Sequence, residues 1–462
     1  MSRPSAPSGR HDAAGPAGFA ERLHRNRLSR RDLLWLFGVS TGAAASAALS
    51  GCATSPVTGK TILVGMSEEE ERAVDQQAAP HQFSQDLGPV QDAGLNQYVS
   101  GLGTRMHALT QRPNMPYSYR VLNANYVNAY TFPGGAMGVT RGIINELNDE
   151  AELSALLGHE LGHVNARHAA QRQGQAMVAQ AAVVGLGVAA AASDASWGGL
   201  AVVGGQIGAS AMLSSYSREN EREADALGQS YMVKAGYPAS GMTDLHALLV
   251  KEEKATPSLL QTMFSSHPMS SERMATAQQL ATTQYAASLQ ANPQRERYMD
   301  NTSGLRRLKP TIDACKNGEV ALSGKKLPEA ERQFGAALKF SGQDYAANVL
   351  MARCLAAQGK RSEALRYADA ARGIYPQEAQ AHKLAGSLQL QGKNPAAAFQ
   401  SFDQFDRLLP GDPGITFLKA VSLEGMGDRP RAAAHYQAFL RSGAQGQSAQ
   451  FAASRLQALG AR

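Results

Sequence analysis

The stretch that most constrains the fold is His159-Glu160-Leu161-Gly162-His163, in a segment with helical patterning from about 149 to 173. Histidines four residues apart lie on one helix face, about one turn from each other, so both imidazoles can reach a single cation. Asn148 or Asp149 can cap the first turn, with Glu152 placed to reach back to the cap. The spacing therefore predicts a helix that presents two metal ligands, with Glu160 between them as a proton acceptor.

Three fixed residues are a modest signal, and a helix with two partly exposed histidines is the alternative until a third ligand is found. The segment 217–225 opens a second predicted helix, which runs to about 234. On it, Glu221 shares a face with small and apolar residues, which marks that face as the packed one. Glu221 is therefore the candidate third ligand, and Asp225, one turn later, is placed to orient a ligand histidine. The same pattern assigns Glu219 and Glu223 to a solvated charged face.

Together these motifs resemble the HtpX, Oma and CAAX-prenyl-protease family of gluzincin zinc metallopeptidases. Ser-Arg-x-x-Glu-x-x-Ala-Asp follows His-Glu-x-x-His, and Glu221 lies fifty-eight residues after His163. The segments 128–135 and 266–268 also resemble that family, and the likeness covers nearly everything after residue 52. It implies an α+β zincin-like domain, mostly helical with a small sheet, and zinc-dependent endopeptidase activity.

The resemblance also implies roles for individual residues. His159, His163 and Glu221 would hold one Zn²⁺ per chain, with Glu160 as the general base. His267 follows Glu221 by forty-six residues, where relatives place a histidine over the metal. It is predicted to be a reversible fourth ligand, the alternatives being a substrate or oxyanion contact or a plain surface role. Arg273 is the first candidate oxyanion donor and Arg218 the second.

Residues 117–141 alternate like strands and are interrupted at Pro133-Gly134-Gly135. In the family this strand borders the active cleft. An extended substrate can add to such an edge by main-chain hydrogen bonds, which are indifferent to side chains. We therefore expect a substrate edge strand with Asn128, Ala129, Pro133, Gly134 and Gly135, an ordinary hairpin being the alternative.

A period of 34 residues appears from residue 311 onward. Small residues and a bulky one recur in register, which is the tetratricopeptide pattern of paired helices. An array of this kind offers a concave surface for protein partners. The recurring positions are Ala330, Ala364, Ala398 and Ala432, then Phe334, Ala368, Phe402 and Tyr436, then Gly318, Ala352, Gly386 and Ala420. Cys315 and Cys354 fall in adjacent repeats, where either a disulfide or two buried thiols is open.

The first fifty-one residues have the pattern of an export signal. Arg30 and Arg31 precede an apolar run over 33–49, and Leu49-Ser50-Gly51-Cys52 follows. This predicts a twin-arginine-type lipoprotein signal peptide over 1–51 and lipidation of Cys52. The general secretory route and a membrane anchor are the alternatives, although the run is short for a span.

Removal of that segment changes what the charge implies. It carries seven Arg against three acidic residues, or +4, so the formal net charge falls from +6 to about +2. Without a basic block, this composition gives no indication of a nucleic-acid partner.

The remaining chain divides into a lipidated N-terminus and tether (52–66), a metallopeptidase domain (67–290), a polar linker (291–310) and four repeats with a capping helix (311–462). The apolar stretch 174–213 is interpreted as tightly packed helices, with a membrane hairpin as the alternative.

The resemblance implies a periplasmic, lipid-anchored protease that degrades misfolded or stalled outer-membrane proteins. The repeats would bind those substrates or the outer-membrane assembly machinery. Ala53 after Cys52 lacks the aspartate that favours inner-membrane retention, so we expect the outer membrane. The alternatives are a chaperone or scaffold with a largely latent protease, and a protease for lipoproteins and signal remnants.

Overall fold

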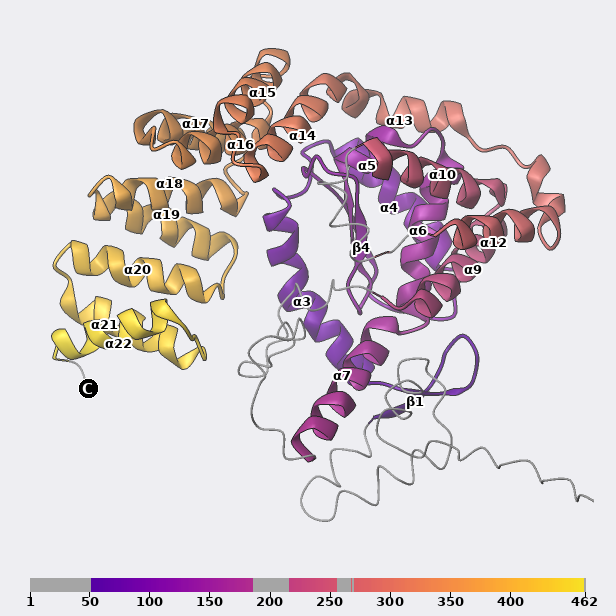
Figure 1. Ribbon diagram of the computed structural model, residues 1–462, viewed down its shortest axis with the longest axis horizontal. Helices are drawn as coiled ribbons and strands as arrows, with labels where there is room; N and C mark the ends of the chain where they lie inside the picture. Colours follow the sequence, from indigo (N-terminus) through magenta and orange to yellow (C-terminus); the bar gives the residue numbers. More distant parts are fainter. Residues whose placement is uncertain (1–50, 186–215, 256–266, 268–269, 461–462) are drawn as a thin grey trace, which may run out of the picture.

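The computed structural model describes residues 51–185, 216–255, 267 and 270–460. Figure 1 shows an N-terminal domain of helices around a small sheet, followed by an arc of paired helices, the repeat array. The predicted export signal and most of the apolar stretch 174–213 lie outside the described residues. Within the described parts of the chain, every helix is too short or too polar to cross a membrane.

The sheet has three strands in the order β3-β5-β4, which confirms the strand pattern of 117–141. β3 (Ser118–Leu122) runs parallel to β5 (Ala136–Thr140), and β4 (Ala129–Thr131) runs antiparallel to β5 on its other side. Asp75 fixes the turn between β4 and β5, since its carboxylate accepts from the backbone N–H of Gly134 at 2.7 Å and of Ala136 at 2.6 Å. β4 is therefore held rigidly at one edge of the sheet.

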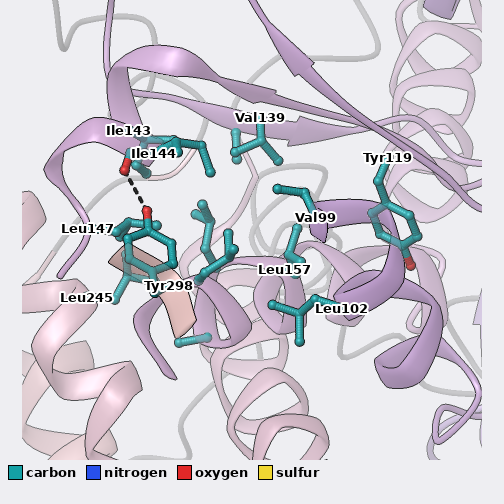
Figure 2. Packing of buried hydrophobic residues seen from close by; sticks show 14 of the residues in the cluster. Val99, Leu102, Tyr119, Val139, Ile143, Ile144, Leu147, Leu157, Leu245 and Tyr298 are labelled. Carbon is teal, nitrogen blue, oxygen red and sulfur yellow. Dashed lines mark hydrogen bonds between the residues drawn. The ribbon is translucent and has the colours of Figure 1, made fainter. Parts of the chain in front are cut away.

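Helix α6 is the centre of the N-terminal domain, and each of its residues is buried. Leu157 of α6 packs with Val99, Val139 and Ile143 in the main apolar cluster (Figure 2). The helices of this domain are α3 (Glu68–Gln85), α4 (Ala93–His107), α5 (Arg141–Glu146), α6 (Glu150–Asn165), α7 (His168–Gly185), α9 (Arg218–Lys234), α10 (Ser240–Ala255) and α12 (Ser271–Thr282), with a 3₁₀ turn η3 (Ala286–Gln290).

Helix α6 begins as predicted but ends earlier. Asp149 caps it by accepting from the Glu152 backbone N–H at 3.0 Å, and Glu152 reaches back to Asn148. The prediction of one helix to residue 173 was wrong. Arg167 adopts a left-handed φ of 59° and starts a new direction, because its guanidinium is fixed by Glu71 at 2.9 Å and by the Met66 carbonyl at 2.9 Å.

Helices α6 and α9 cross with almost no side chain between them. A Cβ atom on Gly162 would lie 2.7 Å from the Ala224 carbonyl oxygen, and one on Gly228 would lie 2.6 Å from the His159 backbone nitrogen. Gly158 meets Gly228 in the same way. Because small residues occupy the crossing on both helices, the metal-ligand candidates of α6 and α9 are brought to one place.

The predicted tether over 52–66 is instead a packed hairpin. β1 (Cys52–Thr54) pairs with β2 (Thr61–Leu63), and Gly65 donates to the Ala170 carbonyl of α7 at 2.8 Å. The Ser55 side chain closes the turn by accepting from two backbone N–H groups, at 3.3 and 3.2 Å. This turn chemistry converts a short polar stretch into ordered structure.

The prediction of a polar linker over 291–310 was also wrong, because this segment does not separate the two domains. Helix α13 (Arg295–Arg307) occupies it and packs into the N-terminal domain. Tyr298 is fully buried and donates its hydroxyl to the Ile144 carbonyl at 2.5 Å (Figure 2). Asn301 and Ser303 lie on the outer face of this amphipathic helix, whereas Thr302 is buried and donates its hydroxyl to the Tyr298 carbonyl at 2.7 Å.

The 34-residue period is confirmed as four helix pairs and a final helix. The recurring residues form the crossings, since a Cβ atom on Gly318 would touch the Phe334 ring and one on Gly386 the Phe402 ring. Cys315 and Cys354 are both buried thiols. The pairs are α14 (Lys309–Ser323) with α15 (Leu327–Phe340), α16 (Tyr345–Ala357) with α17 (Arg361–Ile374), α18 (Ala379–Gln391) with α19 (Pro395–Leu408) and α20 (Pro413–Gly425) with α21 (Arg429–Arg441), before α22 (Gln447–Ala458).

The array folds back against the N-terminal domain, beside α3 (Figure 1). Arg141 of α5 forms a buried two-bond ion pair with Asp344, at 2.6 and 3.1 Å. Further along the array, Glu378 accepts from Ser84 of α3 at 2.5 Å. Removal of one partner of such a buried pair leaves an uncompensated charge, so these contacts fix the orientation of the array.

The α6–α9 crossing predicts the effect of one added methyl group. Gly162→Ala should lower the free energy of unfolding by roughly 1–3 kcal/mol, because the crossing has no room for a Cβ atom. Gly373→Ala is the control, since its Cβ atom would meet nothing within 4 Å and a helix gains about 0.5–1 kcal/mol from the change. Urea unfolding of both variants measures this, and a Gly162→Ala protein as stable as wild type would contradict the close crossing.

Candidate metal centre

Four predicted ligand residues converge at the α6–α9 crossing. His159 Nε2 lies 3.1 Å from His163 Nε2 and 3.2 Å from His267 Nδ1. Glu221 Oε1 lies 3.4 Å from His163 Nε2 and 3.1 Å from His267 Nδ1. All four side chains are buried. His267 comes from the segment between α10 and α12, so the cluster unites three separate parts of the chain.

The spacing of these atoms fits zinc. Ligand atoms about 2.0–2.1 Å from a tetrahedral zinc ion are about 3.3 Å from one another, close to the separations observed here. Burial lowers the pKa of His163 well below its ordinary value, so its imidazole is neutral, which is the form that binds metal. Two imidazoles and a carboxylate, with a third imidazole alongside, are a donor set that zinc prefers.

Glu160 lies beside the ligands without joining them. Its Oε1 is 3.7 Å from His267 Nε2. Its Oε2 is buried and lacks a hydrogen-bond partner among the described residues. Burial raises the pKa of this carboxyl above its ordinary value, although His267 and His159 oppose the shift. Such a carboxyl is suited to accept and return a proton near neutral pH.

Asp225 and Arg273 contact the candidate ligands on atoms that do not face the centre of the cluster. Asp225 Oδ1 is 2.9 Å from His159 Nδ1, the ring nitrogen that faces away from the cluster. Arg273 Nε bonds Asp225 Oδ2 at 2.6 Å, and its Nη1 lies 2.7 Å from Glu221 Oε2. Burial would raise the pKa of Asp225, but bonds from Arg273, His159 and His246 hold it well below its usual range. Asp225 is therefore a charged acceptor that orients His159.

Sequence reasoning missed three side chains at the site. His246 of α10 lies 3.3 Å from Asp225 Oδ1, and Tyr216 stacks on His163 with ring centroids 3.9 Å apart. His168 lies at the Nδ1 edge of the His163 ring, with its own Nδ1 2.9 Å away. The assignment of Glu223 to a solvated face was also incomplete, because its carboxylate reaches His168 at 3.3 Å. The sequence did offer a signal for His168, which is a histidine only five residues after His163. It offered no comparable signal for His246 or Tyr216.

The predicted edge strand lies next to the cluster. Thr131, Phe132 and Pro133 lie around a gap, too small to hold a water molecule, together with His163 and Tyr216. The Phe132 N–H donates to the Ala136 carbonyl, and the Asn128 carbonyl accepts from the Thr140 N–H, so both groups face β5. Because backbone groups alternate in direction along a strand, those of Ala129 and Thr131 point away from β5.

Comparison with known proteins places the chain in a family. A model described as Peptidase family M48 matches residues 94–281, and a tetratricopeptide-repeat model matches 321–388. Metalloprotease LoiP of Escherichia coli is 31% identical over 180 residues, which are 38% of this chain and 68% of LoiP. The chain belongs to peptidase family M48. The matched M48 region contains every residue of the cluster, and zinc is the metal of M48 metalloproteases.

Two further relatives of this M48 chain are both named beta-barrel assembly-enhancing protease. A putative beta-barrel assembly-enhancing protease of Vibrio cholerae is 29% identical over 202 residues, and the beta-barrel assembly-enhancing protease of Escherichia coli is 28% identical over 199. Each match covers 42% of this chain and 40% of the relative, so it spans less than half of those proteins.

Proposed function

We propose that this M48 chain is a zinc metalloendopeptidase. The observation that carries the proposal is the set of four buried donors around one point. Beside them lies Glu160 Oε2, which has no hydrogen-bond partner in the described parts of the chain. When bound, zinc supplies a Lewis acid that brings the pKa of a water molecule towards neutrality and polarises a carbonyl. His159, His163 and Glu221 would hold it.

In this proposal the proton is moved by Glu160. Its Oε2 accepts a proton from the attacking water and then returns it to the leaving amine. Arg273 was predicted as the oxyanion donor, but its contacts with Asp225 and Glu221 favour a positioning role instead. Arg218, the second candidate, is exposed at the start of α9.

We assign substrate binding to the edge of β4 that does not pair with β5, an edge whose residues are buried in this structure. An extended polypeptide would pair with the backbone groups of Ala129 and Thr131 that point away from β5, on the strand that lies beside His163. Asn128, Pro133, Gly134 and Gly135 then act by shaping the strand and its turn, which Asp75 holds in place. Main-chain pairing would tolerate many substrate sequences.

We further propose that the protein works in the periplasm. A lipid on Cys52 would anchor it to the outer membrane. Cys52 is exposed at the start of the β1–β2 hairpin, as a modified residue must be. The names of the two assembly-enhancing relatives support misfolded or stalled outer-membrane proteins as substrates.

The array is proposed to hold those substrates or the outer-membrane assembly machinery. A groove of about 440 Å³ lies between α3 and the array, lined by charged and apolar side chains that include Arg72, Arg120 and Leu409. A scaffold with a largely latent protease, and a protease for lipoproteins and signal remnants, remain the two other functions to be tested.

The test compares two carboxyl-to-amide variants. Glu160→Gln should reduce hydrolysis of an unstructured peptide by at least about 100-fold while zinc content stays at one per chain, because Glu160 moves protons and does not hold metal. Glu221→Gln should instead lose zinc, since a charged ligand becomes neutral. Activity in a zinc-loaded Glu160→Gln protein would overturn the assignment.

The same Glu160→Gln protein separates the substrate classes in cells. Crosslinking should trap outer-membrane barrel proteins. Small lipoproteins alone would favour the second alternative, and a cellular phenotype unchanged by Glu160→Gln would favour the scaffold.

His267 is proposed to be a reversible ligand that holds the resting protease inactive. Its Nδ1 lies with the other donors, at 3.2 Å from His159 Nε2, where it would fill the position that water needs. His267→Ala should therefore hydrolyse peptide faster than wild type at equal zinc content, or degrade itself. A zinc-loaded but inactive variant would show that His267 contacts substrate or the oxyanion instead.

A further inference from the structure

His168, the first residue of α7, has both ring nitrogens engaged in the interior. Its side chain is fully buried. Its Nδ1 lies 2.9 Å from Nδ1 of His163, and its Nε2 lies 3.3 Å from Oε2 of Glu223. The chain of contacts thus runs from a candidate metal ligand on α6, through α7, to a carboxylate on α9.

The fold places His168 there through the sharp turn at Arg167. This residue has a left-handed φ of 59°, so the chain changes direction directly after α6, and residue 168 lies against residue 163. The turn is anchored by the bond from Arg167 Nε to Glu71 Oε1 at 2.9 Å. The position of the imidazole is therefore set by buried contacts and not by a free loop.

Hydrogen-bond direction then follows from the chemistry of imidazole. If Nε2 of His163 offers its lone pair to a metal, the proton of the neutral ring is on Nδ1. That N–H must donate to Nδ1 of His168, which leaves the His168 proton on Nε2 and directed at Glu223. The reverse direction would put a proton on Nε2 of His163 and block metal binding.

We propose that His168 and Glu223 form a relay that fixes the metal-binding tautomer and ring orientation of His163. The proposal rests on the zinc site described above. In this proposal a carboxylate of α9 orients each ligand histidine of α6. Asp225 contacts His159 directly, and Glu223 acts on His163 through His168. His168 is a positioning residue and not a ligand, because its Nδ1 faces the side of His163 opposite to the cluster.

The test is zinc affinity of the full chain, measured by competition with a chromogenic chelator. Glu223→Gln should weaken zinc binding by about 10-fold, because the amide oxygen accepts the bond but carries no charge. Glu219→Gln is the matched control, since Glu219 is exposed on the same helix and should leave affinity unchanged. The metal-free melting temperature of both variants should equal that of wild type.

Two substitutions of His168 add an independent readout. His168→Phe removes both bonds and should weaken zinc binding by up to about 100-fold. His168→Asn can keep an acceptor near the Nδ1 position, so it should restore part of the affinity. Equal zinc affinity in wild type, Glu223→Gln and His168→Phe would overturn the relay, as would an effect on metal-free stability alone. Failure of the wild-type protein itself to bind one zinc would overturn the proposed function instead.

Discussion

The close crossing of α6 and α9 is the contact on which the rest of the site depends. Backbone approaches backbone at Gly162 and Gly228, with no space for a Cβ atom on either. Ligands on α6 and α9 can meet only because these helices lie so near each other. The small residues in the two motifs are therefore as necessary to the geometry as the histidines and the glutamate.

Such a crossing buries charge, and the surrounding residues are arranged to compensate it. Arg273 bonds Asp225 and contacts Glu221, so two buried carboxylates share one buried cation. A buried charge without a partner is costly. Bonds from Arg273 hold the pKa of Asp225 well below its usual range, and His267 and His163 do the same for Glu221 against the effect of burial. The same arrangement holds Asp225 as an acceptor for His159.

Features that follow from local periodicity could be predicted from the sequence. The 3.6-residue period identified the buried face of Glu221, and the 34-residue period identified the buried small and bulky residues of the repeats. Features set by tertiary contacts could not. The change of direction at Arg167 depends on Glu71 from a distant helix, so the break before α7 and the contact between His168 and His163 were missed. Similarly, the polar residues of α13 concealed Tyr298, which packs in the core.

The central claim is that this crossing assembles a zinc site from three parts of the chain. The most direct measurement is anomalous diffraction at the zinc absorption edge from crystals of the purified full-length protein. The account predicts one zinc ion per chain, within about 2.2 Å of His159 Nε2, His163 Nε2 and a Glu221 oxygen. The account also predicts His267 Nδ1 as the fourth donor to this zinc ion in the resting protein. Zinc bound elsewhere, or held without Glu221, would contradict it.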